Sequence, residues 1–170
     1  MKFNLIDQIE SISAQRIVAL KQVSLAEEYL ADHFPTFPVL PGVLMLEAMT
    51  QAAAWLLHTR HNFGCSMAVL REVRNVRYGR FVAPGDALRI EVELTRELPD
   101  GGVFKAAGAV GDAQAVWARL ELAYFNLAER QPALADIDAR LREHNRRRWG
   151  LLHRSDAAAA ALAQSQDTGT

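Results

Sequence analysis

Two ionisable side chains, His33 and Glu47, are spaced so that they could act together as an acid and a base. Glu47 is the only charged residue between positions 43 and 57. Burial among Leu, Met and Ala favours the protonated carboxylic acid, which is the form that a general acid needs near neutral pH. An imidazole can serve as the matching base. Such a pair suits removal of a proton next to a carbonyl with loss of a β-hydroxyl group.

Three neighbouring residues could hold the substrate or the acid. Gln51 follows Glu47 by four residues, so on a helix its amide can fix the carboxyl group in one orientation. Gly42 and Val43 begin the predicted helix, where backbone N–H groups are free and the helix dipole is positive. Glycine also allows an acyl group to approach the backbone closely. These amides could stabilise a developing oxyanion.

Each of these residues also has an ordinary structural explanation. A histidine just before a proline is most often a loop residue. A glutamate in an early helical turn often serves the helix dipole. The stripe formed by positions 47, 50, 51, 54 and 58 could be a narrow solvated face of an amphipathic helix. Spacing alone leaves these explanations beside the catalytic one.

The elements that position these residues follow from the hydrophobic pattern. Residues 16–23 predict a first strand, rich in β-branched and aliphatic side chains. Residues 24–38 contain Pro35 and Pro38 and predict an irregular, stiff loop. Residues 42–61 are rich in Leu, Met and Ala with no proline, and they predict one long helix. That helix is apolar nearly all round, so we expect it to be buried.

After the helix the pattern changes to an alternation of apolar and polar residues. Residues 88–95 and 116–125 both alternate in this way, which is typical of strands with one core face. Pro-Gly-Asp, Asp-Gly-Gly and Gly-Asp turns separate about four such strands, so an antiparallel sheet is expected. We therefore predict an α+β fold with a curved antiparallel sheet wrapped round one long central helix.

An extra C-terminal helix is expected after the sheet. Leu134, Ile137 and Leu141 recur at helical spacing and predict the face that packs on the core. The arginines of residues 140–154 would then be solvated. The expected division is residues 1–130 for the sheet and long helix, 131–154 for the Arg-rich helical extension, and 155–170 for a flexible tail.

Composition excludes several classes of function. With 170 residues and a net charge of −1, the chain suits one domain without a general attraction to nucleic acid or membranes. A single cysteine, Cys65, excludes an internal disulfide, and its spacing from His58 and His61 does not fit a metal site. We find no secretory signal and no apolar stretch of about 18 residues, so we expect a soluble, cytoplasmic protein without a membrane span.

Around the candidate pair the sequence resembles the 3-hydroxyacyl-[acyl-carrier-protein] dehydratases of the FabZ/FabA family. The likeness covers roughly residues 3–126, and so long a string with fixed gaps is a specific signal. The matching runs are His33-Phe34-Pro35, Pro38-Val39-Leu40-Pro41-Gly42-Val43-Leu44, Glu47-Ala48-Met49, Gln51, Val76-Arg77-Tyr78, Val82 and Pro84-Gly85-Asp86. An acid that is Glu rather than Asp favours the FabZ branch, which dehydrates without isomerising the double bond.

The resemblance implies a hotdog fold and the conversion of (3R)-hydroxyacyl-acyl carrier protein to trans-2-enoyl-acyl carrier protein in fatty acid or related lipid biosynthesis. It implies that His33 abstracts the C2 proton and that Glu47 protonates the departing hydroxyl. Gly42 N–H would hold the thioester oxygen, and Gln51 would orient Glu47. A homodimer is also implied, with His33 of one subunit facing Glu47 of the other; trimers of such dimers occur in the family. The substrate is carried on phosphopantetheine, and no cofactor is implied.

Two positions depart from the family pattern, because Asp32 and Thr36 replace glycines that usually flank His-Phe-Pro. Thr36 adds bulk near the substrate passage, and Asp32 could favour the protonated form of His33. Both put the substrate range in question.

The acyl carrier protein is acidic, so a basic docking patch is expected. Arginines recur at positions 71, 74, 77 and 80, but in a strand they would not share one face. We assign the contact to Arg77 and Arg80, with ordinary surface arginines as the alternative. Two other functions also stay open: a hotdog acyl thioesterase, in which a carboxylate activates water, and a non-catalytic acyl-binding hotdog subunit.

Overall fold

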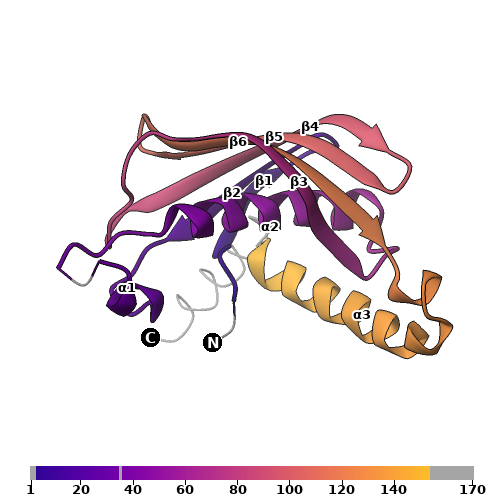
Figure 1. The fold of residues 1–170 in the computed structure, drawn as a ribbon. Coiled ribbons are helices and arrows are strands. Elements are labelled where there is room, and N and C mark those ends of the chain that lie inside the picture. The colour runs from indigo at the N-terminus through magenta and orange to yellow at the C-terminus, as the bar shows by residue number, and fades with distance from the viewer. Residues whose placement is uncertain (1–2, 35, 154–170) are drawn as a thin grey trace, which may run out of the picture.

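Six strands form one antiparallel sheet that curves over a long helix, α2, in the computed structural model (Figure 1). The structure describes residues 3–34 and 36–153, so the tail expected at 155–170 lies outside the described residues. The elements are β1 Gln8–Ile12, β2 Arg16–Gln22, α1 Tyr29–Asp32, α2 Gly42–Arg60, β3 Met67–Tyr78, β4 Ala87–Leu98, β5 Gly101–Val110, β6 Ala113–Phe125, two 3₁₀ turns at Leu127–Glu129 and Pro132–Leu134, and α3 Ala135–Leu152. The predicted α+β fold is confirmed.

The strand order in the sheet is β1-β2-β4-β5-β6-β3, which leaves β3 at one edge. Its register against β6 shifts twice, between Leu70 and Glu72 and between Arg74 and Arg77. At the second shift Asn75 adopts a φ of 55°, as the extra residues of a bulge often do. The edge strand is therefore long but irregular.

Two short elements were not predicted from the sequence. In β1 the register shifts between Ile9 and Ser11, so the alternation that marks a strand is broken there. Helix α1 lies inside the segment expected to be a loop, and it buries Leu30. His33 directly follows α1, and its backbone N–H donates to Tyr29 O at 3.1 Å. This short helix therefore fixes the backbone of a candidate catalytic residue.

The core lies between α2 and the concave face of the sheet. Small residues of α2, Ala48 and Ala52, are fully buried and allow the helix to approach the strands closely, while Met49 and Leu56 fill the space between them. On the sheet side the largest fully buried side chain is Phe104 of β5. This packing holds α2 along its whole length, as expected of a helix that is apolar nearly all round.

Helix α3 docks through different residues from those predicted. Ile137 is 43% exposed, so its assignment to the core is wrong. Asp138, the next residue, is instead 1% exposed. Its carboxylate accepts hydrogen bonds from Ser66 Oγ and from the backbone N–H groups of Leu127 and Ala128. Burial alone would raise the pKa of Asp138, but these hydrogen bonds lower it below its ordinary value.

The other end of α3 lies on an aromatic cluster of α2. The rings of Trp149 and Trp55 are 5.9 Å apart between centroids. Beside them His58 is buried and stacks on Phe63, with centroids 5.9 Å apart. Its Nε2 lies 3.4 Å from Asn145 Nδ2 of α3, and its Nδ1 has no partner among the described residues. Burial lowers the pKa of His58 to about 4.

This shift predicts acid-dependent stability. The pKa of His58 is about 4 in the folded chain against an ordinary 6.5, so the unfolded chain binds more protons between these pH values. We expect the free energy of unfolding to fall by up to ~3 kcal/mol as the pH drops through this window. Urea unfolding at a series of pH values would measure it. His58→Leu should remove this component and His61→Leu, at a more exposed site, should keep it; an unchanged pH profile in His58→Leu would contradict the assignment.

Candidate active site

His33 lines an apolar pocket of about 410 Å³. Its ring packs on that of Phe34, with centroids 4.4 Å apart, and Phe34 has a φ of 51°. The left-handed backbone at Phe34 turns the chain sharply after His33. The pocket is lined by His33, Phe34, Val39, Leu40, Gly42, Met45, Tyr78, Gly79, Arg80 and Phe81. The structure thus brings three of the predicted site residues, His33, Gly42 and Arg80, to one pocket.

Gly42 makes room for an aromatic ring. A Cβ at this position would lie 2.9 Å from Cε1 of Tyr78, closer than carbon atoms normally approach. Tyr78 ends β3, so the tip of α2 and the end of the edge strand meet at this point. The glycine was expected to admit an acyl group, and the structure adds a second reason for it.

The first backbone N–H groups of α2 point out of the N-terminal end of the helix and are not bonded within it. Pro41 O accepts hydrogen bonds from Leu44 N at 2.9 Å and Met45 N at 3.2 Å. The N–H groups of Gly42 and Val43 precede these and have no acceptor within the helix. No acidic residue occupies the first turn, and the Val43 side chain is 68% exposed. The positive end of the helix dipole is therefore uncompensated beside the pocket.

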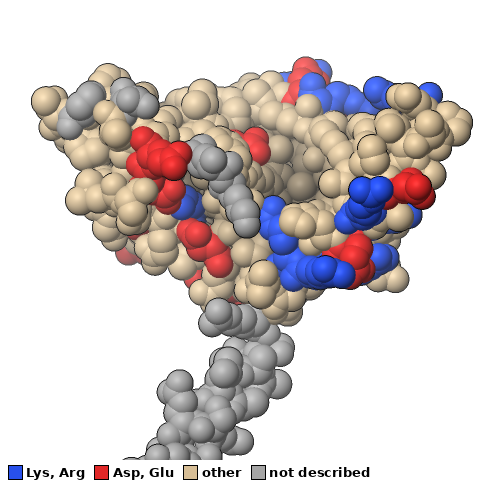
Figure 2. All heavy atoms as spheres, turned by 90° about the horizontal axis from the view of Figure 1, so that it is seen from below, with Lys and Arg blue, Asp and Glu red and all other residues tan. Residues whose placement is uncertain are grey.

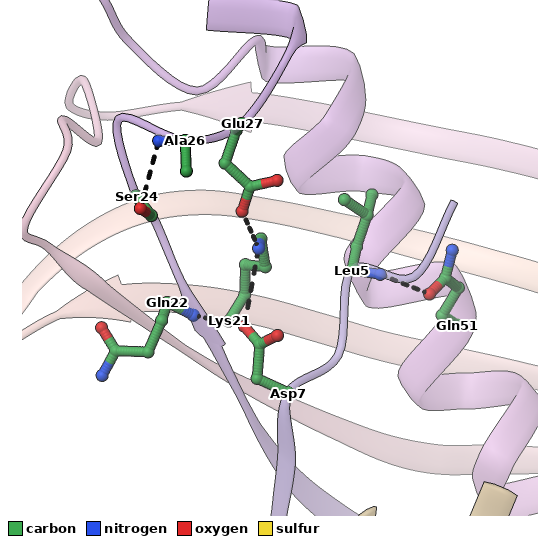
Figure 3. A network of polar contacts seen from close by, with 8 residues as sticks. All are labelled: Leu5, Asp7, Lys21, Gln22, Ser24, Ala26, Glu27 and Gln51. Carbon is green, nitrogen blue, oxygen red and sulfur yellow. Dashed lines mark hydrogen bonds and ion pairs between the residues drawn. The ribbon is translucent and has the colours of Figure 1, made fainter. Parts of the chain in front are cut away.

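Gln51 holds Glu47 and is itself held by the N-terminal segment. Gln51 Nε2 donates to Glu47 Oε1 at 2.9 Å and to Phe3 O at 3.2 Å. Leu5 N donates to Gln51 Oε1 at 2.9 Å, a bond drawn in Figure 3. The hydrogen bond expected from the four-residue spacing is present. The backbone clamp at Phe3 and Leu5 had no sequence signal, because its partners are 46 and 48 residues apart.

A buried lysine ties this N-terminal segment to the loop that leads to α1. Lys21 is 3% exposed, and its ammonium contacts Asp7 Oδ2 at 3.5 Å and the carboxylate of Glu27 (Figure 3). The same oxygen of Asp7 accepts a hydrogen bond from Gln22 N at 2.7 Å. The network therefore links the segment that clamps Gln51 with the segment that carries His33.

Within one chain the two candidate catalytic residues do not share a pocket. Glu47 is half-buried on α2 and is not among the residues that line the His33 pocket. Large apolar side chains around that pocket face solvent: Phe34 and Phe37 are both 57% exposed, and Phe81 is 65% exposed. Sequence reasoning missed Phe37 and Phe81, since only the fold brings them to one surface.

The two arginines assigned to carrier-protein contact lie near the pocket but in different surroundings. Arg80 lines the pocket, and its guanidinium contacts Phe81 O at 3.1 Å and Asp86 Oδ2 at 3.5 Å. Arg77 lines an adjoining hollow of about 660 Å³ together with Tyr78, and no ion pair is found for it among the described residues. Arg71 and Arg74 are bound to Asp100 and Glu72.

Thr36, one of the two departures from the family pattern, is exposed and does not line the pocket of the single chain. The effect expected of the Asp32 side chain lies outside the described part of the structure. Among residues 3–34 and 36–153 no three His, Cys, Asp or Glu side chains are grouped to hold a metal ion. No helix within those residues is long and apolar enough to cross a membrane.

The chain is similar to dehydratases in sequence. The FabA-like domain family matches residues 1–119. A 3-hydroxyacyl-[acyl-carrier-protein] dehydratase FabZ of Pelotomaculum thermopropionicum is 42% identical over 123 residues, which cover 72% of this chain and 86% of the relative. The FabZ of Clostridium perfringens is 38% identical over 108 residues, covering 64% and 78%.

Solved structures show the same fold at low identity. The dehydratase heterocomplex ApeI:P of Xenorhabdus doucetiae matches with a TM-score of 0.65 and 21% identity, covering 78% of this chain and 90% of that one. The E. coli PaaI protein matches with a TM-score of 0.54 and 13% identity, covering 68% and 81%. The hotdog fold expected from the sequence is confirmed.

The contact between Gly42 and Tyr78 can be tested by a double-mutant cycle. Gly42→Ala should cost about 1 kcal/mol of unfolding free energy in the native background, because the new methyl group overlaps the ring. In a Tyr78→Ala background the same change should be neutral or stabilising, since alanine favours helix. Urea unfolding of the four proteins would measure the coupling. An equal effect in both backgrounds would show that the ring is not the reason for the glycine.

Proposed function

The chain belongs to the family of FabA-like domains, and from this membership we infer that it is a 3-hydroxyacyl-acyl carrier protein dehydratase of the FabZ type. The reaction converts a (3R)-hydroxyacyl thioester into a trans-2-enoyl thioester and water in fatty acid biosynthesis. The observation that carries this function is that the family match, residues 1–119, spans His33, Gly42, Glu47 and Gln51 together.

The proposed elimination uses groups whose positions are described above. His33 takes the proton from C2 of the acyl chain, and the electrons form the C2–C3 double bond. Glu47 gives its proton to the 3-hydroxyl, which leaves as water. The Gly42 N–H at the tip of α2 stabilises the negative charge that develops on the thioester oxygen. Gln51 keeps the Glu47 carboxyl in one orientation through their 2.9 Å hydrogen bond.

We place each site between two subunits of a homodimer. Three features support this: Glu47 is not among the residues that line the His33 pocket, β3 is an edge strand, and the exposed side chains of Phe34 and Phe81 line that pocket, with exposed Val43 next to Gly42 in the chain. Monomers rarely expose so many large apolar side chains together. A second copy would cover them and bring its Glu47 to the pocket of the first. That cover would also complete the burial of Glu47, which the single chain gives only in part.

Mixed dimers test both the residues and the interface. His33→Ala and Glu47→Gln homodimers should each lose activity by roughly 10³-fold, because each lacks one proton-transfer group. A heterodimer of the two variants, isolated with two different affinity tags, should recover roughly half of the native kcat, because one of its two sites keeps both groups. Enoyl thioester formation would be followed by ultraviolet absorbance.

If both groups acted within one subunit, the heterodimer would be as inactive as its parents. The product separates this function from its rival in the same assay. Release of a free thiol instead of an enoyl thioester would identify an acyl thioesterase, and unchanged function in Glu47→Gln would favour a non-catalytic acyl binder.

We also propose that Arg77 and Arg80 contact the acidic carrier protein beside the pocket. Arg77→Glu should lower kcat/KM for acyl carrier protein substrates by about tenfold and spare the matching pantetheine thioester, because only the protein partner meets the reversed charge. Arg80→Glu should act in the same direction. Arg74→Glu is the control, since Arg74 already pairs with Glu72. Equal loss on both substrates would refute the docking role.

A further inference from the structure

A further pocket lies along α2 and begins at Gln51, whose amide donates a hydrogen bond to Glu47. It has a volume of about 210 Å³ and is lined by Gln51, Ala54, Trp55 and His58 of α2, by Phe3, and by Asn145 and Arg148 of α3. Gln51 thus belongs to this pocket and also donates to the Glu47 carboxyl. The pocket therefore begins where the proposed acid is held.

The spacing along α2 suits the far end of an acyl chain. Glu47 and Trp55 are eight positions apart on one continuous helix, and helix geometry gives ~12 Å between them. A substrate with its 3-hydroxyl at Glu47 and its chain directed along α2 would bring its distal carbons to Ala54 and Trp55. Ala54 and Trp55 supply the apolar surface on the α2 side of the pocket, between the polar side chains of Gln51 and His58.

The α3 side of the pocket is cationic and polar. The guanidinium of Arg148 lies over the ring of Trp55 at 5.7 Å, and no carboxylate pairs with it among residues 3–34 and 36–153. By contrast, its neighbour Arg147 pairs with Glu143 at 2.9 Å. Partial burial lowers the pKa of Arg148, so this cation has lost solvent without gaining an anion. Asn145 adds an amide beside it.

This polar wall comes from outside the matched family region. The family match ends at residue 119, and α3 spans Ala135–Leu152. Figure 2 shows basic side chains gathered on the half of this face where α3 lies, around a hollowed surface. The chain-length and chain-end preferences of the relatives therefore need not apply to this protein.

We propose that the pocket between α2 and α3 receives the distal end of the acyl chain, and that Arg148 selects 3-hydroxyacyl groups that end in a carboxylate. This inference rests on the proposed dehydratase function. A terminal carboxylate would supply the anion that Arg148 does not find among residues 3–34 and 36–153, in a site where partial loss of water strengthens the ion pair. A methyl end of equal length leaves the guanidinium unpaired.

The test compares two pantetheine thioesters of equal chain length, 3-hydroxydecanoyl and its ω-carboxy counterpart 3-hydroxydecanedioyl. The native protein should show a higher kcat/KM for the carboxylate-ended substrate, by about tenfold. Arg148→Met keeps the long apolar stem over Trp55 and should reverse that preference. Arg147→Met, which removes the same charge from the neighbouring position outside the pocket, should leave it unchanged. Thermal unfolding would verify that α3 is still folded in both variants.

Three outcomes would overturn the inference. A native preference for the methyl-ended substrate, or an equal kcat/KM for both, would show that Arg148 does not select the chain end. An equal loss of preference in Arg147→Met and Arg148→Met would indicate a long-range charge effect instead of a binding pocket. Dehydration of neither substrate, nor of any other 3-hydroxyacyl thioester, would overturn the proposed function and this inference with it.

Discussion

Burial of one helix against a curved sheet is the constraint on which the other features depend. Helix α2 carries the amides at its tip, the Glu47–Gln51 pair two turns later and the His58 cluster near its end. Because Ala48 and Ala52 are fully buried between the helix and the sheet, a slide or rotation of the helix that adjusted one of these regions would disturb close packing. A shift at one end would be transmitted to all three. Core packing therefore sets the positions of the candidate site residues that α2 carries.

Much of this architecture follows from the sequence, because its signals are long. The apolar run of α2 and the alternation in β4 and β6 extend over many residues. The structure forms the predicted helix and strands at these positions. Short or interrupted signals failed. The bulge in β1 hides its strand pattern, and the four-residue α1 is too short to show a helical period. Helix α3 was found, but its contact face was not, because a carboxylate anchors it where hydrophobic periodicity predicts Ile137.

Only part of the candidate site could be predicted from the sequence, because some of its contacts are local in the chain and others are not. The spacing of Glu47 and Gln51 is local, so helix geometry alone predicts their contact. The pocket around His33 depends on Tyr78, the last residue of β3, and on Phe81, which follows that strand. The partner of Lys21 in the N-terminal segment, and the clamp on Gln51 beside it, likewise join residues that only the folded chain brings together. Local spacing predicted the contact between Glu47 and Gln51, whereas the residues that support His33 and Gln51 could be found only from the fold.

The irregular edge of the sheet has a consequence for assembly. A long, straight and unpaired strand is a template for any extended chain, and such edges lead to uncontrolled aggregation. In β3 the two shifts of register and the left-handed Asn75 interrupt the regular row of donors and acceptors. In the proposed homodimer, an identical strand related by twofold symmetry would present the same interruptions in reverse order. The irregular edge of β3 would therefore favour pairing with a second copy of this chain over pairing with unrelated extended peptides.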